Sequence, residues 1–153
     1  MKNYASLREF MDHLEERGRL VRVREPVSPR LEITEIHTRL LAEQGPAVLF
    51  ENVEGSAMPL LTNLFGTVER VAWGMGREPS ELRAVGEMLA FFRQPQPPES
   101  FREAIGMMPL MKAALSMKPR TTNHAPCQEI VLEGNDIDLG RLPIQSCWPG
   151  EPA

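Results

Sequence analysis

The chain has 153 residues, of which 42% are hydrophobic, enough for one soluble globular unit with a core of its own. Its formal net charge of -4 at pH 7 argues against a non-specific nucleic-acid binder, which needs a basic surface to displace counterions from phosphates. The longest apolar runs, such as AVLF and LAFF, are far shorter than the ~20 residues that cross a bilayer, so no transmembrane segment is expected.

An amphipathic helix and a strand are predicted at the start of the chain. Ser6 and Glu9 have the spacing of a capping box, and Gly18 is a stop signal. Between them the apolar residues repeat at helical spacing, which predicts one buried face. The segment 19–27 follows, and its alternation of valine with arginine is typical of a half-buried strand.

A second helix and two further strands are predicted next. Ser28 can cap a helix whose first residue is Pro29, where the missing N–H is harmless, and Gly45 would end it. Residues 47–53 form an apolar run typical of a buried strand, and residues 58–66 are another strand candidate.

The middle of the chain is predicted to be helical. Thr67 can cap a helix that ends in the glycines of GMG at 74–76, and Pro79 begins a further helix. The proline-rich segment 93–100 then leads to two short helices within 101–115. The apolar residues expected to face inward after Pro79 are Leu82, Val85, Leu89 and Phe92.

From Lys118 the sequence becomes loop-like, with turn residues between short apolar segments. This pattern predicts a β-rich region, with a strand from Leu142 to Trp148 and a turn at Pro149–Gly150. The mixed order of elements predicts an α+β or α/β fold, with a domain boundary near residue 120.

Two further features predict a cytoplasmic protein. The N-terminal sequence MKNYASLREF has no apolar core of the kind that signal peptides contain. The two cysteines do not form a C-x-x-C pair, which fits a reducing compartment and gives no disulfide framework.

His124, Cys127 and Cys147 are the residues closest to a metal site or a thiol nucleophile. A structural zinc site usually needs four ligands in two close pairs, and only one loose pair exists here. A nucleophilic Cys147 would need a base such as His124 and a depressed pKa, yet neither cysteine begins a predicted helix. The favoured interpretation is a loop histidine and two buried thiols, with Trp148 as a packing residue.

Glu32 and Glu35, with His37 nearby, could form an acid–base group. The spacing of Glu35 and Arg39 instead favours a solvated ion pair on a helix. His37 lies beside the apolar stripe of the same helix, so we interpret it as a boundary residue.

Three other patterns have structural interpretations. Five arginines are clustered in one stretch of the sequence: Arg17, Arg19, Arg22, Arg24 and Arg30. They could bind an anion, but the cluster favours a solvated strand edge that is protected by charge against pairing with another strand. The GMG at 74–76 is too short for a phosphate loop. Clustered methionines favour core filler or an interdomain surface, and they are Met107, Met108, Met111 and Met117. From the residues alone, no catalytic, cofactor-binding or metal-binding residue can be assigned.

Five segments carry a family resemblance. They are LEITEI (31–36), GPAVLFENVEG (45–55), MPLLTNLFGT (58–67), RVAWGMG (70–76) and APCQEIVLEGNDIDLGRLPIQSCWPGEPA (125–153). Together they resemble the N-terminal part of the UbiD family, the 3-polyprenyl-4-hydroxybenzoate decarboxylases of ubiquinone synthesis and their relatives. The resemblance runs from about Tyr4 to Pro149 and is greatest to the bacterial ubiquinone-pathway branch.

The resemblance implies a carboxy-lyase that decarboxylates aromatic or unsaturated carboxylic acids without oxidation. Such enzymes use prenylated FMN, with Mn²⁺ and K⁺, and the flavin accepts the electrons of the carbanion left when carbon dioxide departs. The resemblance also implies that residues 1–120 form an N-terminal α/β accessory domain and that residues 121–153 begin a split β-barrel-like flavin-binding domain. The family's catalytic and ligand residues lie beyond the matched region, and its C-terminal domain forms a homo-oligomer.

Two hypotheses of different classes therefore stand. In the first, the chain is the N-terminal segment of a decarboxylase that converts 3-polyprenyl-4-hydroxybenzoate to 2-polyprenylphenol, inactive and without tightly bound flavin when isolated. In the second, it is a non-catalytic binding or assembly module. A reading frame that continues past Ala153 would support the first hypothesis, and a stop codon there would support the second. The first also predicts apolar surface on the methionine-rich helices and the final strand, favouring self-association.

Overall fold

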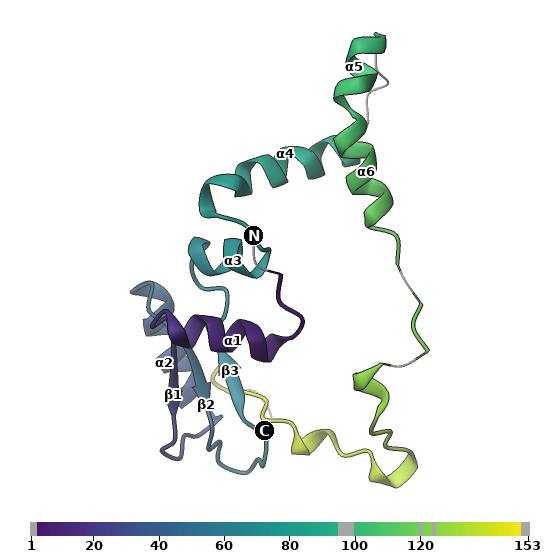
Figure 1. Ribbon diagram of the computed structural model, residues 1–153. Helices are drawn as coiled ribbons and strands as arrows, with labels where there is room; N and C mark the ends of the chain where they lie inside the picture. The colour runs from purple at the N-terminus through teal and green to yellow at the C-terminus, as the bar shows by residue number, and fades with distance from the viewer. Residues whose placement is uncertain (1–2, 95–99, 120, 124, 151–153) are drawn as a thin grey trace. The chain divides into compact units, whose positions relative to one another are not determined.

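The computed structural model of the chain describes residues 3–94, 100–119, 121–123 and 125–150. The fold has two compact units, one built from the residues up to Glu81 together with those from Asp138 onward, and the other from Leu82 to Ile137. Helices and a small sheet are both present (Figure 1), which confirms the predicted α+β class. None of the described helices is long and apolar enough to cross a membrane.

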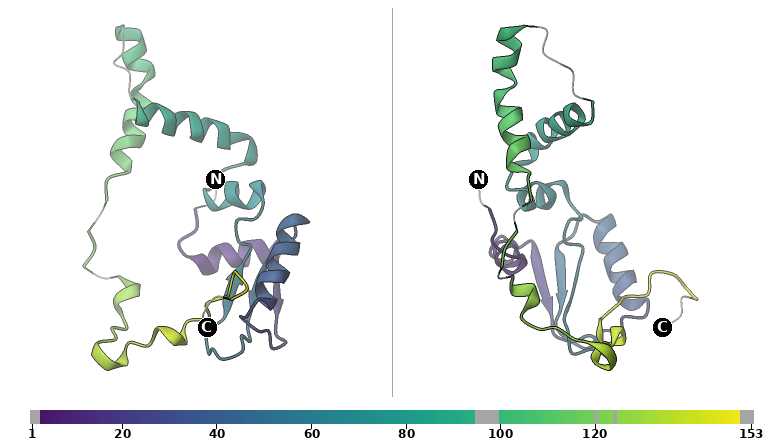
Figure 2. Two further views of the ribbon diagram at one scale, coloured as in Figure 1. Left: turned by 180° about the vertical axis from the view of Figure 1, so that it is seen from behind. Right: turned by 90° about the vertical axis from the view of Figure 1, so that its right-hand side faces the viewer.

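The first unit is built on a three-stranded sheet with the order β1-β2-β3. Strand β1 (Leu20–Val23) is parallel to β2 (Ala47–Phe50), and β2 is antiparallel to β3 (Leu60–Thr62). A parallel pair needs a crossover connection, which helix α2 (Glu32–Ala42) provides. Helix α1 (Leu7–Glu16) lies on the opposite face of the sheet from α2, as Figure 2 shows.

Strand β2 is buried on both faces, and its alternating side chains divide the core into two clusters. Ala47 and Leu49 pack on the α1 side, whereas Val48 and Phe50 pack on the α2 side. The α1-side cluster consists of Phe10, Leu14, Leu20, Ala47 and Leu49. The α2-side cluster consists of Val27, Ile33, Val48, Phe50 and Val53. The buried strand predicted from the AVLF run is therefore confirmed.

All three strands are shorter than the segments predicted for them. After β1 and β2 end, the two segments that follow them pair again in an isolated bridge between Val27 and Val53. Pro26 has no N–H to donate, which interrupts the ladder before this bridge. Strand β3 ends before Asn63, whose backbone has a left-handed conformation with φ 54°. This conformation is incompatible with an extended strand.

The predicted caps of α1 are confirmed. The Ser6 hydroxyl accepts a hydrogen bond from the Glu9 N–H at 3.2 Å, and the Glu9 carboxylate accepts one from the Ala5 N–H at 2.8 Å. At the other end Gly18 has φ 64°, the left-handed conformation with which many helices end. Local signals thus fix both ends of this helix.

The predicted start of α2 at Ser28 and Pro29 is wrong, because the helix begins at Glu32. Its N-cap residue is Leu31, which has φ 66° and makes no side-chain capping bond. The Ser28 N–H donates to the Glu32 carboxylate at 2.8 Å. The Pro29 carbonyl accepts a hydrogen bond from the N–H of Ser146. A helix that began at Pro29 would have used this carbonyl for a bond within the helix.

Helix α3 (Val68–Gly74) has the predicted boundaries. The Thr67 side chain caps it by accepting from the Arg70 N–H, and Gly76 ends it with φ 65°. A one-turn 3-10 helix, η1 (Pro79–Glu81), follows and completes this part of the first unit. The interpretation of GMG as a helix terminator is confirmed.

The second unit contains three helices, α4 (Leu82–Arg93), α5 (Phe101–Gly106) and α6 (Met108–Ser116). No residue of α4 is buried, so the predicted inward face is only partly covered: Leu82, Val85 and Phe92 are half-buried and Leu89 is exposed. Phe101 is 84% exposed and Leu115 is 78% exposed. Interpreting the methionines as core filler is wrong, because Met108, Met111 and Met117 are exposed.

The β-rich region predicted after Lys118 is wrong for the described residues. Three 3-10 turns occur there, η2 (Pro126–Gln128), η3 (Gly134–Asp136) and η4 (Leu139–Arg141). The predicted strand at 142–148 is reduced to an isolated bridge between Ser146 and Arg30. A strand needs a continuous row of backbone partners, which α2 cannot offer because its N–H and C=O groups bond within the helix. The turn at Pro149–Gly150 is confirmed.

The α1-side cluster makes a testable contribution to stability. Leu14 is fully buried, whereas Leu7 on the same helix is 55% exposed. We expect Leu14→Ala to lower the free energy of unfolding by about 2–5 kcal/mol, because it leaves a cavity in the core. The matched control Leu7→Ala should cost less than about 1 kcal/mol. Urea unfolding followed by far-UV circular dichroism measures both, and equal costs would contradict this packing.

Candidate functional site

The cysteine candidates do not form a site among the described residues. Cys127 and Cys147 are both exposed, and neither forms a disulfide. Cys147 Sγ lies 3.9 Å from the carbonyl oxygen of Gln145. Trp148 is 71% exposed. The interpretation of these residues as buried packing groups is therefore wrong, and His124 lies outside the described residues.

The acidic candidates on α2 have structural roles. Glu35 Oε1 accepts from Arg39 Nε at 2.7 Å on the exposed side of the helix, which confirms the predicted ion pair. Glu32 receives the Ser28 N–H before the first turn. His37 is half-buried, as expected of a boundary residue. In the part of the chain that the structure describes, no group of three His, Cys, Asp or Glu side chains is placed to hold a metal ion.

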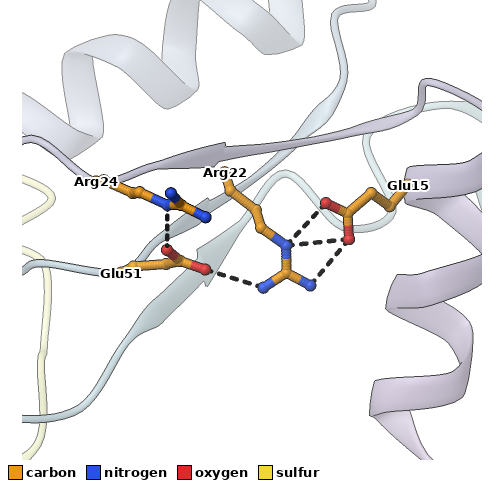
Figure 3. A network of polar contacts seen from close by, with 4 residues as sticks. All are labelled: Glu15, Arg22, Arg24 and Glu51. Atoms are coloured by element: carbon orange, nitrogen blue, oxygen red, sulfur yellow. Dashed lines mark hydrogen bonds and ion pairs between the residues drawn. The ribbon is translucent and has the colours of Figure 1, made fainter.

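The arginines of β1 form a charged network (Figure 3). Arg22 donates to both carboxylate oxygens of Glu15 on α1, with Nε–Oε1 and Nη2–Oε2 distances of 2.9 Å. Its Nη1 donates to Glu51, the residue after β2, at 3.0 Å. Arg24 Nε donates to the other Glu51 oxygen at 3.2 Å. Strand β1 is an edge of the sheet, so the interpretation of a charged edge is confirmed for Arg22 and Arg24, with their charges paired, whereas Arg17 lies at the C-terminal end of α1.

The network keeps its carboxylates ionised. Hydrogen bonds from Arg22 lower the pKa of Glu15, and hydrogen bonds from Arg22 and Arg24 lower the pKa of Glu51. The same two carboxylates raise the pKa of Arg22. A carboxylate with a lowered pKa is a poor proton donor near neutral pH, so this network stabilises the sheet edge and is unsuited to acid catalysis.

A buried arginine, which the sequence did not reveal, joins α3 to the sheet. Arg70 is 1% exposed, and its guanidinium donates to three backbone carbonyls. Their distances are 2.9 Å to Gly45, 3.0 Å to Asn63 and 3.1 Å to Leu64. Burial lowers the pKa of Arg70, and the nearby charge of Arg19 adds to this effect.

Asn63 completes the junction around Arg70. Its side-chain amide donates to the carbonyls of Gly45 and Pro46, at 3.2 and 2.9 Å. A Cβ atom at position 66 would lie 1.8 Å from the Asn63 Oδ1, so only glycine fits there. The loop before β2 and the loop before α3 are thereby held together.

An aromatic group of side chains lines a cavity of about 360 Å³ between α1 and α3. Three rings line it: Tyr4 lies 5.4 Å from His13, and His13 lies 5.6 Å from Trp73 with its plane turned edge-on. The Arg17 guanidinium lies over the Trp73 ring, 4.8 Å from its centre. Burial raises the pKa of Tyr4, so its phenol is neutral near pH 7. Sequence patterns missed this group, because the rings come from separate segments.

Comparison with families of known proteins gives one match. A model described as the N-terminal domain of 3-octaprenyl-4-hydroxybenzoate carboxy-lyase matches residues 11–89. The matched region is just over half of the 153 residues and includes all three strands of the sheet.

Three solved structures extend this similarity. The closed form of vanillic acid decarboxylase from Sedimentibacter hydroxybenzoicus is 25% identical over 97% of this chain and 28% of its own, with a TM-score of 0.69. Its open form with truncated ShVdcD is 29% identical over 64% of this chain and 22% of its own, with a TM-score of 0.52. An evolved dimeric form of the UbiD-class enzyme HmfF from Pelotomaculum thermopropionicum, in complex with prFMN, is 33% identical over 61% of this chain and 21% of its own, with a TM-score of 0.50. The chain thus spans only between 21% and 28% of the length of these enzymes.

The buried arginine can be tested by substitution. Arg70→Gln shortens the side chain and leaves buried carbonyls without donors, at a cost of about 1–3 kcal/mol for each unsatisfied group. We expect a lower free energy of unfolding and a smaller urea midpoint. Arg30→Gln, a control at an exposed arginine, should change the free energy by no more than about 0.5 kcal/mol. An unchanged midpoint for Arg70→Gln would contradict the structural role.

The charged network predicts a pH dependence. Glu15 and Glu51 have pKa values below the ordinary 4.5 in the folded state, so their contribution to stability is present above pH 4.5 and is lost as the pH falls through the lowered values. Arg22→Gln should therefore reduce the drop in the urea midpoint between pH 7 and pH 3. Arg39→Gln removes an exposed pair and should leave the drop as in the unmodified chain. Equal drops in all three proteins would refute the coupling.

Proposed function

Because the chain belongs to the UbiD family of decarboxylases, we propose that it forms the N-terminal domain of an enzyme that decarboxylates aromatic carboxylates with prenylated FMN. The observation that carries this proposal is the family match, which includes the whole sheet. The similarity of nearly the entire chain to vanillic acid decarboxylase supports it. In this proposal residues 1–120 are the accessory domain, and residues 121–153 begin the flavin-binding domain.

We propose 3-polyprenyl-4-hydroxybenzoate as the substrate and 2-polyprenylphenol as the product. The description of the matching family and the resemblance of the sequence segments to the ubiquinone-pathway branch both support this choice. The complete enzyme would use Mn²⁺ and K⁺ with the flavin, act in the cytoplasm and form a homo-oligomer.

The described residues do not fit the cofactor's metal. A divalent cation such as Mn²⁺ needs several oxygen or nitrogen donors that converge on one point. The described ranges contain no such group, and the carboxylates of Glu15 and Glu51 are already held by arginines. We therefore assign no step of decarboxylation to these residues. Their role is to form a stable domain with its own two-sided core.

The alternative of a non-catalytic assembly module has one observation in its favour. Apolar side chains of the second unit are exposed, with Phe101 and Ile130 the most extreme among those described there. Contiguous exposed apolar surface is typical of protein interfaces. In the decarboxylase proposal the same side chains would contact other parts of the enzyme, so exposure alone does not separate the two functions.

A chimaera tests the decarboxylase proposal. Residues 4–149 would replace the matching segment of Sedimentibacter vanillic acid decarboxylase. If the chain is the corresponding domain, the chimaera should bind prenylated FMN and release carbon dioxide from vanillate. The 153-residue chain alone, given flavin, Mn²⁺ and K⁺, should release none, and the same chimaera carrying Leu14→Ala should lose stability. A folded, flavin-loaded chimaera that releases no carbon dioxide would count against the proposal.

A further inference from the structure

We propose that the cavity between α1 and α3 is a binding site for a small planar organic anion, of which benzoate is the simplest example. The proposal concerns a second site, separate from any decarboxylation chemistry, and it does not rest on the proposed function. Every side chain that it requires belongs to the first unit of the fold.

The walls of the cavity suit a flat ligand. Tyr4, His13 and Trp73 are inclined to one another at interplanar angles of 53° and 80°, so the wall that they form combines ring faces with ring edges. Aromatic pairs favour such offset and edge-on arrangements, because the ring face is negative and the ring edge positive. A planar ligand ring could make both kinds of contact, which a saturated ring of similar size could not.

The turn that follows α3 forms part of the cavity wall. Gly76 lines the space, and its left-handed conformation with φ 65° lets the chain turn away from Trp73 without a side chain. The resulting volume of about 360 Å³ lies at the lower end of the ~300–1,000 Å³ found for small-molecule sites. This volume is sufficient for a single substituted ring.

Arg17 offers the cavity a cation for an anionic ligand. Among the described residues, the ion pairs do not include Arg17, and its guanidinium lies over the Trp73 ring. The second arginine of the lining, Arg77, is paired with Glu81 at 3.6 Å, and Glu81 also accepts the Glu78 N–H at 2.8 Å. The Glu78 side chain is exposed at the rim, whereas Arg17 lies beside the ring that a ligand would contact. A ligand carboxylate could bind Arg17 through two parallel N–H donors, the geometry that guanidinium groups favour.

Trp73 makes binding directly observable. In a Trp148→Phe background Trp73 is the remaining tryptophan, so its indole N–H gives a single side-chain resonance in the ¹H–¹⁵N spectrum. Benzoate would be titrated at constant ionic strength into this variant. We expect a saturable shift with a Kd on the order of 1–10 mM, as a ligand of this size allows.

Matched ligands and variants separate the contributions of ring and charge. Benzamide lacks the charge, cyclohexanecarboxylate lacks the flat ring, and benzylamine reverses the charge, so each should bind several-fold more weakly than benzoate. Arg17→Gln should weaken benzoate binding by roughly tenfold, the loss expected for one charge-assisted hydrogen-bonded contact. Arg30→Gln should leave the Kd unchanged. Arg17 is exposed, so its replacement should not unfold the protein, and far-UV circular dichroism verifies this.

Several results would overturn the proposal. A shift that stays linear in benzoate concentration would show that the cavity has no site for the anion. Equal Kd values for the Arg17→Gln and Arg30→Gln variants would show that Arg17 does not bind it. Tighter binding of benzylamine would assign the cavity to cations instead. Because the measurement involves no flavin and no turnover, each of these results would leave the decarboxylase proposal unaffected.

Discussion

The burial of β2 on both faces is the constraint on which the first unit depends. A strand of four residues, Ala47–Phe50, places alternate side chains in two separate clusters, so each face needs its own helical cover. Helix α1 covers one face and α2 the other, and α2 also makes the crossover that the parallel pairing with β1 requires. The order of helices and strands in this unit follows from satisfying both faces of one short apolar run.

Arg70 links the position of the aromatic cavity to the position of β2. Its guanidinium binds the carbonyl of Gly45, just before β2, and the carbonyls of Asn63 and Leu64, just before α3. The start of α3 is therefore fixed relative to the central strand. Trp73 lies one turn further along the same helix, so the position of the aromatic cavity depends on a buried charge that lies outside it.

The sequence predicted features that local chemistry decides and missed those that depend on distant contacts. The caps of α1 and α3 were correct, because Ser6, Thr67 and the terminal glycines act within one turn. The start of α2 was wrong, because Ser146 takes the Pro29 carbonyl. The cavity was also missed: Tyr4, His13 and Trp73 follow no shared spacing, and Arg17 was assigned to the solvated edge. The local sequence around Arg70 gives no sign that its guanidinium binds three backbone carbonyls, one of them at Gly45 before β2.

Two hydrogen bonds to Ser146 explain how the chain returns to its first unit. The Pro29 carbonyl accepts the Ser146 N–H at 2.9 Å, and the Thr34 hydroxyl donates to the Ser146 carbonyl at 2.6 Å. The second of these bonds joins residues 112 positions apart, so the residues from Leu82 to Ile137 are an insertion between two parts of one unit. The segment around Ser146 is held at a fixed place beside α2, whatever the conformation of the insertion. In the proposed decarboxylase the start of the flavin-binding domain would therefore be positioned by the sheet-bearing unit, through backbone groups that no side-chain pattern in the sequence reveals.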